Sequence, residues 1–235
     1  MLEFVRNKKI MVVVAHPDDE VLGIGSTVHK MIHEQGCEAV ALILGEGITS
    51  RSDSRNPKEW EEELKVHNQN IQNAAKHIGY KEVITYNFPD NRFDSVDLLD
   101  IIKAVEKEKS AFQPDIIFTH HGGDVNIDHQ RTFQSVITAC RPMEDEVVKT
   151  IIAFETASGT EWRASTDPFH FQPNLFMPLN ETQVLAKCQA MEEYEFEKRA
   201  YPHPRSSEAL KIQAQRWGIT IGTAYAEAFQ LVRSR

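Results

Sequence analysis

Two short runs of histidine and acidic residues have the composition of a metal-dependent hydrolytic site. The first, at residues 16–20, reads His-Pro-Asp-Asp-Glu, and the second, at residues 124–129, reads Asp-Val-Asn-Ile-Asp-His. A catalytic zinc needs about three nitrogen or oxygen ligands and one open position for water. His16, Asp19 and His129 supply two imidazoles and one carboxylate. The sequence therefore predicts that these three residues bind a catalytic zinc ion.

Asp18 is left free beside the predicted ligands. A carboxylate there can accept the proton of the zinc-bound water and later return it to the departing amine. Pro17 fixes its own φ and stiffens the turn that holds these side chains. An isolated histidine is more often structural, and Asp18 with Asp19 could also cap a helix N-terminus. The coincidence of two such clusters favours the metal site.

The elements predicted around these clusters bring them to one edge of a sheet. Apolar runs predict five buried strands, at residues 10–15, 39–44, 83–88, 115–120 and 150–155. Helices are predicted at residues 21–35, 57–78, 96–111 and 129–140. This alternation predicts a mostly parallel α/β sheet with helices on both faces. Since such sheets bind ligands outside the carboxyl ends of their strands, both clusters and Glu46 are expected at that edge.

Several helix boundaries have recognisable start and stop signals. Asn56 before a proline, with Glu59 three residues on, predicts a capping box, and Asn180 with Gln183 predicts another helix start. The predicted helix ends are at Gly36, Gly79 and Gly218.

The last third of the chain follows a different pattern. Residues 169–179 hold two internal prolines among alternating apolar residues, which predicts an edge strand. Helices are expected from Asn180 to about Lys198 and over residues 207–217. No repeat or low-complexity linker interrupts the sequence, so residues 1–235 are expected to form one domain.

The bulk composition excludes several classes of protein. The net charge of −9 opposes tight binding to nucleic acid, whose phosphates need a basic surface. No apolar run approaches the length of a membrane span, and the first residues hold no secretory apolar segment. Three scattered cysteines are typical of a reducing compartment rather than a disulfide framework. We therefore expect a cytoplasmic protein.

The two metal motifs resemble those of a known enzyme family. Ala-His-Pro-Asp-Asp-Glu at residues 15–20 is similar to the first motif of the LmbE-like, or PIG-L, N-deacetylases, and residues 124–129 resemble their second. Further similar segments lie at residues 155–158, 161–162, 171–174 and 202–206. The resemblance implies a Rossmann-like fold and one zinc ion bound by His16, Asp19 and His129, with Asp18 as general base. It also implies removal of an N-acetyl group from an amino-sugar compound, such as a nucleotide sugar or a glycan precursor.

The second motif departs from that of some relatives at Asn126. Relatives with a His-Pro-Asp-His motif use its first histidine to stabilise the tetrahedral intermediate. Asparagine can donate a hydrogen bond to an oxyanion, worth about 3 kcal/mol where measured, but it is no general acid. Either Asn126 takes a reduced role in catalysis, or His203, His121 or Asp18 itself supplies the acid. Asp128 is expected to orient a neighbouring histidine.

The sequence identifies the substrate-binding residues less clearly than the metal ligands. Either Arg51 or Arg55 resembles the arginine with which relatives grip their substrate, and Glu46 follows a strand at the expected edge. Arg205 lies with His203 in a proline-rich loop that could hold a preorganised binding group. Each of these residues is equally typical of an ordinary surface loop.

Other functions remain open from the sequence. An amidase acting on a thiol or sugar conjugate would use the same water attack, and a sugar- or metal-binding module could keep the motif without turnover. A nucleotide-dependent enzyme is disfavoured because no Gly-x-Gly-x-x-Gly turn follows the first strand. The expected partner is a small N-acetylated sugar, and self-association into a homo-oligomer is a further possibility.

Overall fold

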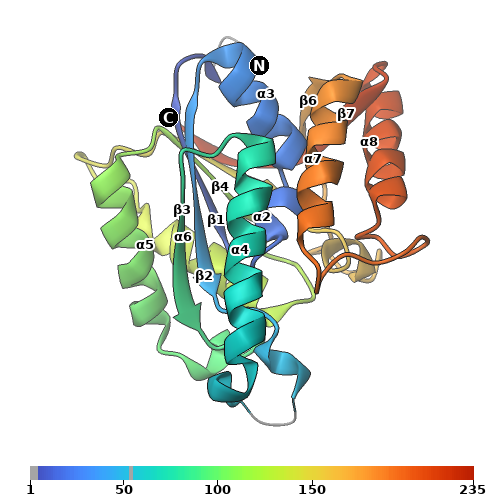
Figure 1. Cartoon of the computed structure of the whole chain (residues 1–235). Helices are drawn as coiled ribbons and strands as arrows, with labels where there is room; N and C mark the ends of the chain where they lie inside the picture. The colour runs from blue at the N-terminus through green and yellow to red at the C-terminus, as the bar shows by residue number, and fades with distance from the viewer. Residues whose placement is uncertain (1–4, 53–54) are drawn as a thin grey trace.

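The computed structural model describes residues 5–52 and 55–235, whose path is drawn in Figure 1. Their strands form one seven-stranded sheet in the order β3-β2-β1-β4-β5-β7-β6. The strands are β1 (Lys9–Val14), β2 (Glu38–Gly45), β3 (Glu82–Phe88), β4 (Ile116–His120), β5 (Thr150–Phe154), β6 (Leu175–Leu179) and β7 (Tyr225–Ser234). The first five are parallel to one another, and β7 is antiparallel to both its neighbours. The predicted mostly parallel α/β sheet is confirmed.

Helices cover both faces of this sheet. They are α2 (Asp19–Leu22), α3 (Gly25–Gln35), α4 (Glu61–Ile78), α5 (Leu98–Phe112), α6 (Ile127–Ala139), α7 (Glu181–Glu193) and α8 (Ser207–Ile221). Short 3-10 helices lie at Thr49–Arg51, Pro57–Trp60, Phe93–Ser95 and Thr160–Trp162. In the described part of the chain, no helix is long and apolar enough to cross a membrane.

Alternate residues of β1 pack on opposite faces of the sheet. Ile10, Val12 and Val14 join the core formed with α3, α4 and α7, whereas Met11 and Val13 join that of α5 and α6. Figure 1 shows these two groups of helices on the two sides of the strands. Because both faces are covered, every one of these positions is apolar, and the strand reads as a continuous apolar run.

The sheet grows in opposite directions from the boundary between β1 and β4. The chain proceeds from β1 through β2 to β3 on one side, and from β4 to β5 on the other. Loops that leave two such neighbouring strands diverge and leave a crevice at the strand ends. The loop after β1 carries His16, and the loop after β4 carries residues 121–126. Both sequence clusters therefore lie at this crevice.

The helix predicted over residues 21–35 is interrupted. Its first turn, α2, stops at Leu22, and α3 begins at Gly25. Gly23 lies so close to Phe154 that a Cβ atom there would be 2.2 Å from the ring. A glycine within a helical pattern is a weak sequence signal, so the interruption was not predicted.

The predicted helix start at Asn180 and the predicted capping box at Asn56 have different outcomes. Asn180 accepts from the backbone N–H groups of Thr182 and Gln183, and the Gln183 side chain accepts from the Asn180 N–H, which confirms the start of α7. Asn56 caps no helix, because a 3-10 turn precedes α4, and its side chain donates to Glu59 instead, at 2.7 Å.

The end predicted for α8 is wrong. This helix continues past Gly218 to Ile221 and ends at Gly222, which has a φ of 75°. Gly218 packs on the following loop, where a Cβ would lie 2.6 Å from the Thr223 carbonyl oxygen. The glycine therefore allows a close approach of two backbone segments rather than a helix end.

The predicted helix to Lys198 ends at Glu193, five residues earlier. Tyr194 turns inward, is fully buried and donates a hydrogen bond to Glu20. Residues 194–206 form a loop that returns to the crevice. The predicted edge strand is confirmed as β6, although it is shorter than residues 169–179, and β7 was not predicted.

Candidate active site

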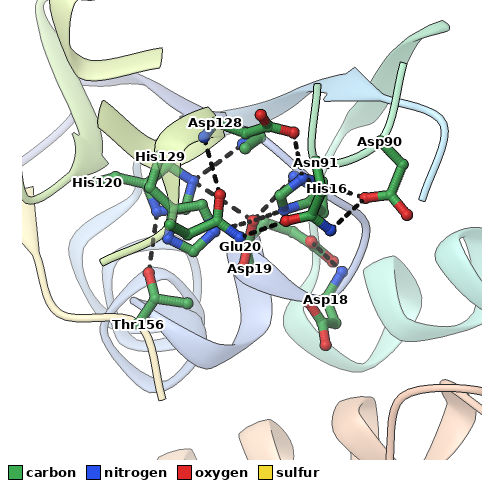
Figure 2. Close-up of polar contacts among 12 residues, drawn as sticks. His16, Asp18, Asp19, Glu20, Asp90, Asn91, His120, Asp128, His129 and Thr156 are labelled. Atoms are coloured by element: carbon green, nitrogen blue, oxygen red, sulfur yellow. Dashed lines mark hydrogen bonds and ion pairs between the residues drawn. The ribbon is translucent and has the colours of Figure 1, made fainter. Parts of the chain in front are cut away.

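The three predicted zinc ligands lie together at the crevice. His16, Asp19 and His129 each offer one ligand atom, and these atoms are within 4.8 Å of one another. Asp19 Oδ2 lies 3.4 Å from His16 Nδ1 and 3.3 Å from His129 Nε2. Figure 2 shows the carboxylate of Asp19 between the two rings. His16 follows β1, Asp19 begins α2 and His129 lies in the first turn of α6, so three separate elements position the set.

Each imidazole has a second carboxylate on its far side. Asp128 Oδ2 lies 2.9 Å from His16 Nε2, and Asp124 Oδ2 lies 3.2 Å from His129 Nδ1. Since a carboxylate only accepts, these contacts favour a proton on those nitrogens and leave His16 Nδ1 and His129 Nε2 free to bind a metal. Such outer carboxylates commonly orient metal-binding histidines.

The charge of the cluster also fits a cation. Burial lowers the pKa of His129, but the charges of Asp19 and Asp124 outweigh burial and raise it to about 9. Burial lowers the pKa of His16 as well, and Asp128 and Asp19 raise it well above its ordinary value. The same carboxylates would stabilise a divalent cation in place of these ring protons. The donor set and its surroundings therefore fit zinc.

His120, at the end of β4, packs against the predicted ligands but is not one of them. Its ring stacks on that of His129, with centroids 3.9 Å apart and an interplanar angle of 8°. Its Nε2 accepts from the Ala15 N–H at 2.9 Å, so Nδ1 carries the proton and donates to Thr156. Burial and His129 lower the pKa of His120 to about 4. A neutral ring here supports His129 without adding charge.

Asp18 stands next to the ligands in a strained backbone conformation. Its φ is 101°, in the left-handed region that non-glycine residues rarely adopt. It occupies the N-cap position of α2, but its side chain makes no capping hydrogen bond. Instead, Asp18 Oδ2 accepts from Arg205 Nη1 at 3.0 Å. The structure therefore excludes capping as the task of this carboxylate.

The surroundings of Asp18 raise the pKa of its carboxyl group. Burial raises its pKa, Arg205 lowers it, and Asp19 and Glu197 raise it further, so that it lies well above the ordinary value. Glu20 fixes the backbone beneath, since its carboxylate accepts from the Asp18 N–H at 3.1 Å. A raised carboxyl pKa suits a group that must take up a proton and give it back.

A cavity of about 110 Å³ opens onto these residues. Six segments of the chain supply its polar and ionisable lining: His16, Asp18, Ser50, Arg51, Asp90, Asn91, Asn126, His129, Ser158, Glu197 and Arg205. Arg51 and Arg205, both predicted as substrate-binding residues, therefore line the same cavity as His16 and His129. Such a cavity has room for a small polar group such as an acetamide.

Asn126 has a structural task as well as a place in the cavity. Its Oδ1 accepts from the Asp128 N–H at 2.8 Å and so caps α6. Its Nδ2 donates to Asn91 Oδ1 at 3.0 Å, which leaves the second hydrogen of this amide without a described protein acceptor. The cap directs the amide nitrogen toward the cavity. A hydrogen-bond donor at this place can serve a developing oxyanion.

Four further residues named from the sequence lie outside this cavity lining. Arg55 and Glu46 form a two-point ion pair, at 2.8 and 2.9 Å, in a neighbouring cavity. His203 accepts from the Arg205 N–H at 3.2 Å through Nδ1. His121 contacts Gln230 and the Phe169 carbonyl through its two ring nitrogens. Of the two arginines that the sequence left open, Arg51 is the one in the cavity.

Sequence reasoning missed Asp90 and Glu197. Asp90 is buried and lies 3.4 Å from His16 Nε2, and Glu197 contacts both cavity arginines. Asp90 follows β3 in the pattern that identified the other clusters, so the strand-end rule could have found it. Glu197 had no such signal, because its segment reads as the end of a helix.

The comparisons with known proteins agree with this geometry. The family model described as PIG-L, GlcNAc-PI de-N-acetylase, matches residues 11–140, which is more than half of the chain. The chain belongs to the PIG-L family. The resemblance inferred from the two motifs is thereby confirmed, and membership identifies an enzyme of the N-deacetylase class.

Individual relatives of this PIG-L protein are distant. It is 27% identical over 194 residues to a protein of Escherichia coli (strain K12) called uncharacterized deacetylase YaiS, covering 80% of this chain and 91% of that one. N,N'-diacetylchitobiose deacetylase from Pyrococcus horikoshii has a TM-score of 0.71 at 19% identity, covering 99% of this chain and 88% of the other. GalB, a 4-carboxy-2-hydroxymuconate hydratase from Pseudomonas putida, has a TM-score of 0.71 at 19% identity, with 97% of each chain covered. At such identities the structural likeness shows the fold alone.

Proposed function

We propose that this protein is a zinc-dependent hydrolase that removes an N-acetyl group from an amino-sugar compound. The observation that carries the proposal is the grouping of His16, Asp19 and His129 within 4.8 Å, with Asp18 beside them and off the ligand set. Membership of the PIG-L family supports the reaction class. A bound zinc ion would act as a Lewis acid toward both the attacking water and the acetyl carbonyl.

The remaining chemistry falls to side chains of this chain. Asp18, held by Arg205, takes the proton of the attacking water and delivers it to the leaving nitrogen. Asn126 Nδ2 offers a hydrogen bond to the oxygen that gains negative charge. Asp128 and Asp124 keep the two histidine rings in the orientation that ligation requires. We infer that Asp18 is both base and acid, because neither His203 nor His121 belongs to the cavity lining.

Acetate release tests the proposal. The zinc-loaded protein should release acetate from N-acetylglucosamine or its glycosides, and a chelator should abolish the release until zinc is restored. A parallel assay should measure amine release from amides with larger acyl groups. Release of such amines without acetate from any N-acetylated sugar would replace the proposal by the amidase alternative, and no amide hydrolysis at all would refute both.

A further inference from the structure

The two arginines of the cavity are joined by one carboxylate. Glu197 Oε1 accepts from Arg51 Nη2 at 2.6 Å, and Glu197 Oε2 accepts from Arg205 Nη1 at 2.5 Å. Arg51 comes from the loop after β2, whereas Glu197 and Arg205 come from the loop between α7 and α8. The Glu197 side chain is only 13% exposed, so its charge is weakly screened by solvent. This bridge is the feature on which the inference depends.

Both arginines make further contacts besides the bridge through Glu197. Arg205 also donates to Asp18 Oδ2 at 3.0 Å and, through Nε, to Ser158 Oγ at 2.7 Å. Arg51 also donates to the Phe196 carbonyl at 2.8 Å. A phosphate that approached either guanidinium would therefore compete with a carboxylate already in place. Arginine binds phosphate through its positive charge and its planar donor fork, and the carboxylate of Glu197 offsets that charge.

The balance of charge around the cavity is negative. Three lining carboxylates, of Asp18, Asp90 and Glu197, face two guanidinium groups. Three more carboxylates lie directly behind the lining, those of Asp19, Asp124 and Asp128. A divalent cation offsets only part of this surplus. An anionic group beside the reacting acetamide would be repelled, whereas an uncharged or cationic group would not.

We propose that Glu197 is a specificity-determining residue that restricts this site to N-acetylated sugars without a phosphate near the acetamido group. Glu197 neutralises Arg51 and Arg205 and so prevents them from serving as a phosphate clamp. The inference deepens the proposed function and rests on it, and it excludes nucleotide sugars as substrates. The remaining substrate class consists of uncharged N-acetylated sugars and glycosides. Among N-acetylated sugars, those that carry a free amine should bind most favourably.

A binding comparison tests this selectivity. Calorimetry at low ionic strength should compare N-acetylglucosamine with N-acetylglucosamine 1-phosphate on the zinc-loaded protein. The wild-type protein should bind the uncharged sugar at least about tenfold more tightly. Glu197→Gln releases one arginine and should reduce this preference by roughly tenfold. Glu195→Gln, an exposed substitution two residues away, should leave the preference unchanged.

The outcomes separate this inference from the proposed function. Equal or tighter binding of the phosphate by the wild-type protein would overturn the inference, even if the Glu197→Gln protein failed to fold. An unchanged preference in folded Glu197→Gln would overturn the role of Glu197. Selective binding without acetate release from either sugar would overturn the proposed function and leave the selectivity standing, whereas equal release from both would overturn the selectivity alone.

Discussion

Asp128→Asn tests how the protein prepares His16 for a metal. Asp128 is completely buried, and both of its oxygens are used. Oδ1 accepts from the Phe93 N–H at 2.9 Å, and Oδ2 lies 2.9 Å from His16 Nε2. Asparagine has one acceptor oxygen, and its amide nitrogen only donates. If the oxygen stays on Phe93, the amide nitrogen faces His16 and pushes the ring proton to Nδ1, the atom needed for the metal.

The expected magnitude follows from this change of tautomer. Loss of a carboxylate behind a metal-binding histidine commonly reduces metal affinity by about 10- to 100-fold. That range corresponds to about 1.4 to 2.7 kcal/mol of binding free energy. Asp128 is buried and faces the nitrogen directly, so the upper half of the range is expected. The protein without metal should lose about 1 to 3 kcal/mol of stability, because a neutral amide replaces the buried carboxylate that pairs with the His16 ring.

A competition assay with a chromophoric chelator measures this affinity. The wild-type protein, Asp128→Asn and a matched control, Asp94→Asn, should be titrated at the same pH. Asp94 is exposed and adjoins Phe93, so its substitution should change zinc affinity by less than a factor of two or so. A zinc affinity of Asp128→Asn equal to that of the wild type would refute the role assigned to this carboxylate.

Three further predictions concern the cap of α6, a buried acid and the metal. Asn126→Asp keeps the capping oxygen but loses the amide donor, so turnover should fall while stability to urea changes little. Asn126→Ala loses both, so it should also reduce the free energy of unfolding by about 1 kcal/mol. Equal turnover in Asn126→Asp and the wild type would contradict the role of the amide donor. Burial raises the pKa of Glu155 from 4.5 to about 7, so the folded state loses stability as pH rises through that interval. As the pH rises from 5 to 8, the stability of Glu155→Gln in urea denaturation should therefore increase relative to that of the wild type by roughly 1 to 3 kcal/mol. The substitution of an exposed residue, Glu208→Gln, should show no such increase. A stability difference between Glu155→Gln and the wild type that does not change with pH would contradict the raised pKa of Glu155. His129→Ala should lower the zinc content per chain measured by atomic absorption, and full zinc content would remove His129 from the ligand set.

The sequence predicted the parallel part of the fold well because its strands are buried on both faces. Such strands read as continuous apolar runs, and a glycine marks the ends of α3 and α4 while an asparagine caps the start of α7. β7 escaped prediction because polar residues interrupt its apolar pattern and its C-terminal half is partly exposed, so its pairing between β5 and β6 is what makes it a strand. Gly218 was misplaced because a glycine needed for a close backbone approach has the same sequence appearance as one that ends a helix.

The residues of the site also fall into two groups, one that the sequence predicted and one that it did not. The segment that follows β1 contains His16, Asp18 and Asp19, and His129 lies in the segment that follows β4. Because β1 and β4 are neighbours in the sheet, the strand order alone brings these residues together. The bridge from Arg51 through Glu197 to Arg205 joins segments about 150 residues apart. Its formation depends on where α7 ends, and that depends on the burial of Tyr194 rather than on any local cap. Contacts that tertiary packing decides in this way have no local sequence signal.

Asp18→Asn provides the most direct test of the separation between metal binding and proton transfer. Asparagine can still accept from Arg205, so the geometry beside the ligands should be retained. Zinc content and acetate release should be measured on the same preparation. The account predicts one zinc ion per chain, as in the wild type, with acetate release reduced by about 100-fold or more. Near-normal release, or loss of the zinc, would contradict the assignment of Asp18 as a base that stands off the metal.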